Sequence, residues 1–557
     1  MAEEHDTTPR WDVLIRGGRI VDGTGNPWFH GDLALRGDRI AAIAPAGTLD
    51  SARAGEVVDA TGHVVSPGFV DIQSHSLVPL LTDPRSLSKV TQGVTTEIMG
   101  ESSTPSPFGG RIDMPFDSGL ERRMGSAAYA EWDALGRTWD RFGDWLRELE
   151  RRRLSVNFGS FIGGGTVREY GKGMDMGPAS AGELQVMRDV LDQAMRDGAF
   201  GIATALIYPP GAYAGFDELA ALLEVVAAHN GIHITHVRSE EARLLEGIDE
   251  AIALSRQTGV ITEIYHLKAA GRKNWHKMPQ AITMIDRARA DGVDVTVDMY
   301  PYEAAGTGLA SCLPYWASEG GHLYENLADP EIRTRLREEM ADENSDWENL
   351  GLAAGPEGIL VAGITNPEII RYRGWRISEI ATDRGQDWRD TVLDLLAIEG
   401  ANIFTMYFVM SEDNLRLQLK QPWIKVSTDA GGVDPEWAEP LGPTHPRAYG
   451  TYPRVLAKYV REEGIITIED AVRKMSSSVC DRLGLRDRGL LREGLKADVI
   501  VFDSATIQDH STWTDTHRLS TGVRDVWVNG GRVLRDGDHT GATPGEWVKG
   551  PGYQTAD

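Results

Sequence analysis

Cysteine is almost absent from this chain of 557 residues, which contains two, Cys312 and Cys480. Two cysteines cannot form a disulfide framework, so a small disulfide-stabilised scaffold is excluded, and a reducing cytosol is compatible with both. Long apolar segments are missing too, because no run approaches the roughly 18 uninterrupted apolar residues of a membrane-spanning helix. The first residues are acidic and polar, which predicts no signal peptide. We therefore expect a cytoplasmic protein with no membrane partner.

Positive charge is also scarce. Lysine and arginine number 57 against 83 aspartates and glutamates, a formal net charge of −26. Such a field repels phosphate backbones, so we expect no nucleic-acid partner. Apolar residues make up 41% and charged residues 25%, which is typical of a globular protein with a sizeable core. The length fits one large α/β barrel with a smaller domain as well as it fits three or four small domains.

The two ends of the chain are both rich in short strands. Residues 12–66 alternate apolar runs with glycine-containing turns. Residues 497–534 repeat that pattern, with a hairpin around Asn529 and Gly530. The two segments predict one β-domain built from both termini, residues 1–66 and 481–557.

The middle of the chain, residues 67–480, alternates short apolar runs with helical patterns, which predicts a parallel sheet with helical crossovers. Eight such strands close a barrel. Nine candidate strands are present: Phe69–Ile72, Thr95–Met99, Val156–Ile162, Gly201–Ile207, Ile232–His236, Ile261–His266, Val295–Tyr300, Ile403–Val409 and Ile424–Thr428. One of them should belong to an insertion, which we place at about residues 303–360 because the pattern breaks there.

Ionisable side chains stand at the ends of several candidate strands, where the catalytic groups of parallel barrels lie. These residues are His236, His266, Asp429 and Glu101, with His75 just after the first strand. Imidazole and carboxylate converging at a barrel mouth predict a site for Zn²⁺ or a similar cation. An open coordination position would hold water and lower its pKa to roughly 7. A nearby aspartate would accept the second proton and return it to a leaving amine.

Longer motifs relate the chain to a known family. They are Val65-Ser-Pro-Gly-Phe-Val-Asp, Gln92-Gly-Val-Thr-Thr, Tyr208-Pro-Pro-Gly, Thr235-His-Val-Arg-Ser-Glu, His266-Leu-Lys-Ala-Ala-Gly, Asp298-Met-Tyr-Pro-Tyr, Thr428-Asp and His445-Pro-Arg-Ala-Tyr-Gly-Thr. With this set the chain resembles the D-aminoacylase (N-acyl-D-amino-acid deacylase) family of the amidohydrolase superfamily. The resemblance implies a metal-bearing (β/α)₈ barrel with a small β-sandwich made from both ends.

The resemblance also implies roles for individual residues. His236 and His266 match the metal-binding histidines of the family, and Asp429 matches its general base. Contacts to a substrate carboxylate are implied for Lys268, Tyr300 and Arg447, and a lysine and an arginine in a pocket suit such an anion. Arg238, beside a metal histidine, is a further candidate substrate contact, unless it orients Glu240 or Glu241 instead.

The chain departs from the family at several of these positions. Where the family has His-X-His, the chain has Gln73-Ser-His, and the glutamine amide is a poor zinc ligand. Ser102 stands at the position of a family cysteine, and Glu101 precedes it with a longer carboxylate. Gly306 stands where a serine is expected, which alters the carboxylate pocket.

These departures predict one divalent metal, Zn²⁺, with the second metal position of the family weakened. We expect Glu101, His236 and His266 to hold it. His75 is then either a weak fourth ligand or a hydrogen-bond donor to substrate.

The sequence thus predicts a metal-dependent amidohydrolase that deacylates an N-acyl amino acid of D configuration, a small-molecule substrate with a carboxylate. Hydrolysis of a cyclic amide, an imide or a small peptide is an alternative. A catalytically inactive scaffold is a second alternative, because two usual ligands are replaced. The acyl group, the side chain, the stereochemistry, the identity and number of the metals and the oligomeric state, including a homo-oligomer, stay open.

Overall fold

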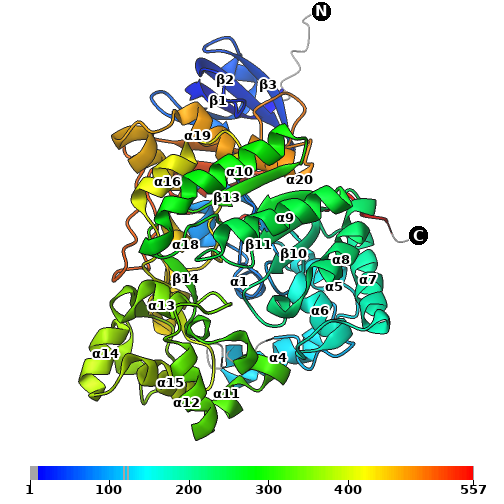
Figure 1. The fold of residues 1–557 in the computed structure, drawn as a ribbon. Coiled ribbons are helices and arrows are strands. Elements are labelled where there is room, and N and C mark those ends of the chain that lie inside the picture. The colour runs from blue at the N-terminus through cyan, green and yellow to red at the C-terminus, as the bar shows by residue number, and fades with distance from the viewer. Residues whose placement is uncertain (1–9, 117–119, 122–124, 556–557) are drawn as a thin grey trace, which may run out of the picture.

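The computed structural model describes residues 10–116, 120–121 and 125–555. One sheet is built from both ends of the chain, at the top of Figure 1. Its strands are β1 (Trp11–Ile20), β2 (Phe29–Arg36), β3 (Arg39–Pro45), β4 (Ala54–Asp59), β5 (Val64–Pro67), β18 (Val499–Phe502), β19 (Val523–Val528), β20 (Gly531–Arg535) and β21 (Asp538–His539). The two ends meet where β5 pairs antiparallel with β18, with Val65 opposite Val501.

Gly17 and Gly18 lie at the point in β1 where the pairing of this sheet changes from β4 to β5. Strand β1 pairs with β2 along one edge and with β4 and then β5 along the other. The register with β2 shifts between Ile15 and Gly18, and Gly17 takes a φ of 69°, which glycine adopts without strain. The resulting fold encloses its own core of Ile15, Leu33 and Trp527, all fully buried.

The central strands form a closed barrel. In order they are β6 (Phe69–Asp71), β7 (Val94–Met99), β8 (Asn157–Ser160) continued by β9 (Ile162–Gly163), β10 (Gly201–Ala205), β11 (Ile232–His236), β12 (Ile261–Ile264), β13 (Val295–Met299) and β17 (Ile424–Val426), all paired in parallel. The ring closes where the amide of Asp429 donates to the carbonyl of Gln73 over 3.0 Å. The fold agrees with the predicted class, a (β/α)₈ barrel with a small β-sandwich domain formed by both termini, and the strands of that terminal domain are hydrogen-bonded as one continuous sheet.

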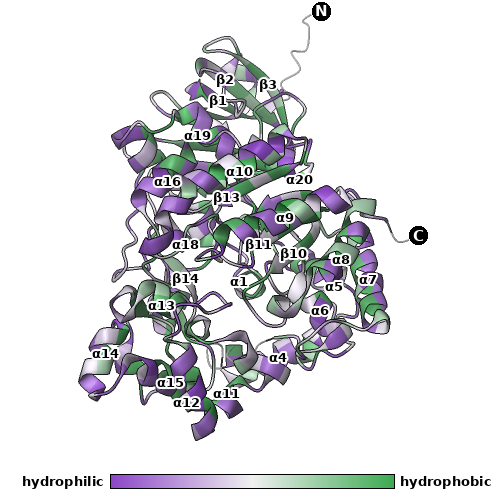
Figure 2. Ribbon diagram, viewed as in Figure 1, coloured by the Kyte–Doolittle hydropathy of each residue, from purple (hydrophilic) through white to green (hydrophobic). Residues whose placement is uncertain are grey.

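Helices surround the barrel and turn their apolar sides towards it. They include α1 (Pro79–Thr82), α2 (Leu87–Val90), α4 (Ser126–Gly136), α5 (Gly143–Arg152), α6 (Gly164–Lys172), α7 (Ala181–Arg196), α8 (Phe216–Ala228), α9 (Leu244–Thr258), α10 (Met278–Ala290), α16 (Glu412–Leu419), α17 (Pro435–Ala438), α18 (Arg447–Arg454), α19 (Ile468–Met475) and α20 (Ser477–Leu483). Figure 2 shows hydrophilic residues concentrated on outer helices such as α9 and α16. Helix α7 begins with a capping box in which Ser180 and Glu183 satisfy each other's backbone amides.

The chain between β13 and β17 forms a second, smaller sheet, at the lower left of Figure 1. It contains β14 (Ala305–Gly308), β15 (Ile359–Val361) and β16 (Phe404–Tyr407), paired antiparallel. Helices α11 (Leu323–Asn326), α12 (Pro330–Glu339), α13 (Leu350–Ala354), α14 (Ile377–Arg384) and α15 (Trp388–Glu399) connect these strands. The candidate strand Ile403–Val409 therefore belongs to the insertion, which continues past residue 360 as far as β16. The domain limits at residues 66 and 480 stay a prediction.

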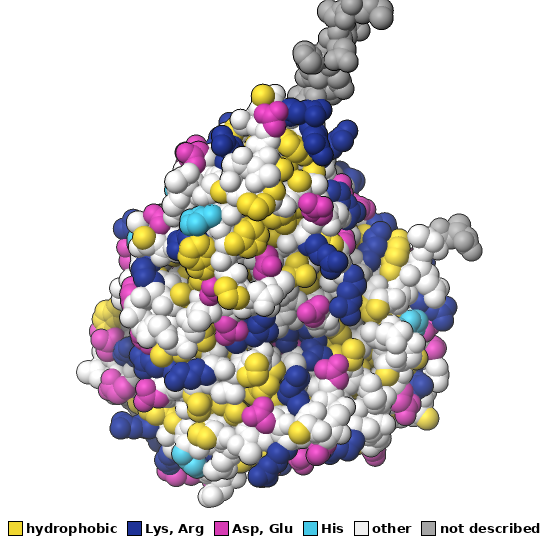
Figure 3. Space-filling view, turned by 90° about the horizontal axis from the view of Figure 1, so that it is seen from above, with side chains coloured by type: hydrophobic (Ala, Val, Ile, Leu, Met, Phe, Trp, Pro, Cys, Tyr) yellow, Lys and Arg dark blue, Asp and Glu magenta, His cyan; other side chains and the backbone are white. Residues whose placement is uncertain are grey.

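The outer surface carries charges of both signs. Figure 3 shows lysine and arginine side chains interspersed with acidic ones on the face seen from above. Of the helices in the described part of the chain, none combines the length and the apolar character that crossing a bilayer requires.

Candidate metal centre

All the sequence-predicted residues except Arg238 gather in a cavity of about 580 Å³ at the carboxyl ends of the barrel strands. His236 ends β11, His266 follows β12, and Glu101 and Asp429 follow β7 and β17. His266 and Asp429 take left-handed backbone conformations, with φ of 31° and 50°. Such conformations are costly for residues with side chains, and they concentrate at functional sites.

Glu101, His236 and His266 form a buried cluster. The Oε1 atom of Glu101 lies 3.7 Å from His236 Nδ1 and 3.4 Å from His266 Nε2. Two atoms that each lie 2.0–2.1 Å from a tetrahedral Zn²⁺ are roughly 3.4 Å apart, so this spacing suits a zinc ion. Neither nitrogen of His236 makes a hydrogen bond to the described residues, although the side chain is buried. Buried imidazole nitrogens without partners are what a metal ligand would present.

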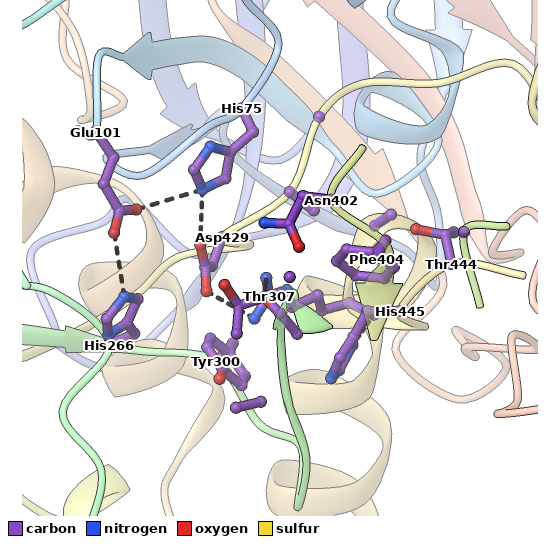
Figure 4. Close-up of a pocket in the computed structure, with 18 of the residues that line it drawn as sticks. His75, Glu101, His266, Tyr300, Thr307, Asn402, Phe404, Asp429, Thr444 and His445 are labelled. Carbon is purple, nitrogen blue, oxygen red and sulfur yellow. Dashed lines mark hydrogen bonds and ion pairs between the residues drawn. The ribbon is translucent and has the colours of Figure 1, made fainter. Parts of the chain in front are cut away.

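Gln73 occupies the neighbouring position. A second group of potential ligands, His75, Glu101 and Asp429, shares Glu101 with the first, and Figure 4 shows the contacts of His75 with both carboxylates. The Gln73 amide donates to Glu101 Oε2 over 2.6 Å and to Asp429 Oδ1 over 3.1 Å. Its own carbonyl accepts from the Ser427 hydroxyl over 3.3 Å. The amide therefore already engages the carboxylate oxygens that a second cation would need.

Asp429 is held on both of its oxygens. His75 Nε2 lies 2.8 Å from Oδ1, and Arg447 Nη1 lies 2.6 Å from Oδ2. Burial would raise the pKa of the Asp429 carboxyl, but the Arg447 guanidinium and the nearby imidazoles lower it below its ordinary value. The carboxylate is thus kept ionised, as a general base requires.

The three predicted substrate contacts line the cavity in different ways. The Lys268 ammonium is paired with Glu240, 2.8 and 2.7 Å from its two oxygens. The hydroxyl of Tyr300 is buried and makes no hydrogen bond within the described part of the chain. The guanidinium of Arg447 lies over the Tyr300 ring, 4.6 Å from its centroid.

Arg238 is turned away from the cavity. Its guanidinium pairs with Glu250 over 2.9 Å and donates to the carbonyls of Ala212 and Ala214. The structure therefore does not support its predicted contact with substrate, nor an orienting contact with Glu240 or Glu241. Arg238 lies two residues after the end of β11. Its side chain points out of the barrel mouth and forms an ion pair with Glu250 on α9.

Two acidic residues of the cavity carried weak sequence signals or none. Glu240 lies four residues after His236. The sequence suggested it only as a partner of Arg238, and gave no sign that it lies beside both imidazoles. Glu348 comes from the insertion, whose path no pattern predicted. It is buried, its Oε1 atom has no hydrogen-bond partner among the described residues, and burial together with Glu240 raises its pKa to about 8.

Carboxylates and imidazoles share the cavity. Among the described residues that line it, Glu101, Glu240 and Asp429 face the histidines, and Lys268 and Arg447 pair with Glu240 and Asp429. The raised pKa of Glu348 favours its neutral form, so Glu348 adds little negative charge. Burial lowers the pKa of His266, yet the surrounding carboxylates outweigh burial and raise that pKa to about 10. The field of the site therefore favours positive charge, and the donor set fits a divalent cation.

Comparisons with known proteins agree with this geometry. A profile of the Amidohydrolase family matches residues 430–534. The chain is 33% identical over 526 residues to an N-acyl-D-glutamate deacylase of Alcaligenes xylosoxydans xylosoxydans, covering 94% of this chain and 93% of the relative. A D-aminoacylase of the same organism is 30% identical, covering 97% and 98%.

A solved structure is similar over almost the whole chain. It is an N-acyl-D-glutamate deacylase from Bordetella bronchiseptica, complexed with zinc and a phosphonate that mimics the tetrahedral intermediate. The TM-score is 0.76 at 28% identity, covering 97% of this chain and 99% of that one. From these relatives and the shared fold, the chain belongs to the D-aminoacylase family of amidohydrolases.

Proposed function

We propose that this protein is a metal-dependent amidohydrolase that cleaves N-acyl amino acids of D configuration to a carboxylate and a free amino acid. The observation that carries the proposal is the cluster of Glu101, His236 and His266 facing Asp429 across one cavity. Its relatives are deacylases of this kind.

The cation is one divalent metal, Zn²⁺, held by Glu101, His236 and His266. When bound, it supplies Lewis acidity that polarises the acyl carbonyl and eases deprotonation of water. The chain's own residues supply the proton transfer. Asp429, fixed by His75 and Arg447, accepts a proton from the attacking water and returns it to the leaving nitrogen.

Two unsatisfied donors suit the α-carboxylate of the substrate. The Tyr300 hydroxyl and the Arg447 Nε–H are buried and make no hydrogen bonds to the residues that the structure describes. A carboxylate placed between them would satisfy both, with charge-assisted hydrogen bonds. The contact predicted for Lys268 stays a prediction, because Glu240 holds its ammonium.

A substrate panel tests the activity. We expect hydrolysis of N-acetyl-D-amino acids, and a kcat/KM at least a hundredfold lower for the matching N-acetyl amines, which lack the carboxylate. Liberated amine is measured with an amine-reactive dye, and N-acetyl-L-amino acids serve as the stereochemical control. Gly306 offers no hydroxyl to the carboxylate, so cyclic amides belong in the panel as the second candidate class. Preferred cleavage of cyclic amides would refute the deacylase assignment, and an inert, metal-free protein would favour the scaffold.

Replacing Gln73 by histidine should create a second metal position. The wild-type amide donates hydrogen bonds to Glu101 and Asp429, whereas a neutral imidazole nitrogen can donate a lone pair to a cation. At saturating zinc we expect one equivalent per wild-type chain and two per Gln73→His chain, measured by elemental analysis after gel filtration. Ser427→Ala, which removes the hydroxyl on the far side of Gln73, should still bind one. Equal zinc contents in all three proteins would show that Gln73 does not control the second position.

A further inference from the structure

Glu240 places one carboxylate beside both imidazoles of the predicted zinc site. It follows β11 and is 3% exposed. Its Oε2 atom lies 3.3 Å from His236 Nε2, and its Oε1 atom lies 3.0 Å from His266 Nδ1. Few side chains can reach two metal-facing rings from different strands at once, and this position allows it because the strands β11 and β12 are adjacent.

The two rings are oriented in opposite senses between two carboxylates. His236 Nδ1 and His266 Nε2 face Glu101, whereas His236 Nε2 and His266 Nδ1 face Glu240. A neutral imidazole that gives one nitrogen to a cation carries its proton on the other nitrogen. Each outer nitrogen then needs an acceptor. Glu240 Oε1 is hydrogen-bonded to His266 Nδ1, and Oε2 lies 3.3 Å from His236 Nε2, which makes no hydrogen bond to the described residues. With the cation on His236 Nδ1, Oε2 is placed to accept the proton on Nε2.

Lys268 fits this arrangement as the partner of Glu240. Its ammonium lies 2.6 Å from His266 Nδ1 as well as within hydrogen-bond distance of both Glu240 oxygens. An ammonium has no lone pair and cannot accept the imidazole proton, so Glu240 is the acceptor at that nitrogen. The lysine instead offsets the cost of burying the carboxylate.

The insertion holds Glu240 from the other side. Glu348, on the segment before α13, accepts from the backbone N–H of Glu240. This contact fixes the main chain of Glu240 just as Lys268 fixes its side chain.

We propose that Glu240 is a positioning residue that orients both zinc-binding imidazoles, and that Lys268 acts through it. The inference rests on the proposed zinc site. Partners of this kind typically change metal affinity 10–100-fold when they are removed.

The test is the zinc affinity of Glu240→Gln, measured by competition with a chelator, together with the visible spectrum of the cobalt(II)-substituted protein. We expect zinc binding to weaken about 10–100-fold and the cobalt bands to shift as the rings lose their orientation. Glu263→Gln is the matched control, because Glu263 is equally buried and paired with Lys425 but contacts neither imidazole. It should keep wild-type zinc affinity while its unfolding temperature falls.

A double variant separates orientation from charge. Glu240→Gln leaves Lys268 unpaired near the cation, and Glu240→Gln with Lys268→Met removes that charge. If the double variant regains wild-type zinc affinity, Glu240 merely neutralises the lysine and the proposal is overturned. Persistent weak binding supports it.

Two further outcomes are decisive. Wild-type affinity and an unchanged cobalt spectrum in Glu240→Gln would also overturn the proposal. If that variant does not fold, Glu240→Asp replaces it, with the same expected loss because the shorter side chain cannot reach both rings. A wild-type protein that binds no zinc would overturn the proposed function as well, whereas equal affinities would overturn this inference alone.

Discussion

Substituting Asp429 by asparagine is expected to lower kcat for the best N-acetyl-D-amino acid by about 10²–10⁴-fold, the usual contribution of a general base. Asparagine is nearly the same size and can keep one contact with Arg447 or His75, but it cannot accept a proton. Zinc content should be unchanged, because the cluster of Glu101, His236 and His266 does not include this side chain. Steady-state turnover and elemental analysis on the same preparation check both parts.

The control for Asp429 is Ser427→Ala, a change of similar size on the same loop that touches no oxygen of Asp429. Its turnover should stay within a few-fold of wild type. If Asp429→Asn turned over at a rate near that of Ser427→Ala, the proton would have to move through another group, and the mechanism proposed above would fall.

Removing the Glu101 carboxylate should have the second large effect. Structural zinc sites bind their ion with about 10–16 kcal/mol, so one of three protein ligands is worth roughly 3 kcal/mol or more, at least a hundredfold in affinity. We expect Glu101→Ala to lose its zinc on dialysis and its hydrolytic activity with it. Inductively coupled plasma analysis before and after dialysis measures the loss.

Ser102→Ala decides between the two adjacent positions. Ser102 also lines the cavity, but Glu101 is the residue whose carboxylate meets both imidazoles. The serine variant should therefore keep its zinc. The opposite result, with zinc retained in Glu101→Ala and lost in Ser102→Ala, would transfer the ligand role to the serine.

The barrel could be predicted from the sequence because its strands are buried on both faces. Runs such as Ile232–His236 are buried along their whole length and alternate with amphipathic helices, a combination typical of parallel barrels. The run from Ile403 to Val409 has the same character, yet β16 pairs antiparallel in the insertion. An apolar run reports burial and carries no information about its neighbours, so its place in the insertion could not be assigned.

Much of the site could also be predicted, because the rule that chemistry lies at strand ends places His236, His266 and Asp429 together. The pairing of the charged side chains could not be predicted. Arg447 forms an ion pair with Asp429, Lys268 with Glu240, and Arg238 with Glu250. These choices depend on distances of a few ångströms between loops from different strands, which spacing along the chain does not encode. Glu348 was missed for the same reason, since its segment reaches the cavity from the insertion.

The join between β5 and β18 has a consequence for how the polypeptide is made. During translation the first five strands leave the ribosome long before their pairing partner β18 exists. Until then the edge of β5 offers unpaired backbone groups, which are a template for association with other nascent chains. Completion of this sheet therefore waits for the synthesis of β18, and protection of the open β5 edge by a chaperone would be most valuable while the barrel is still being synthesised.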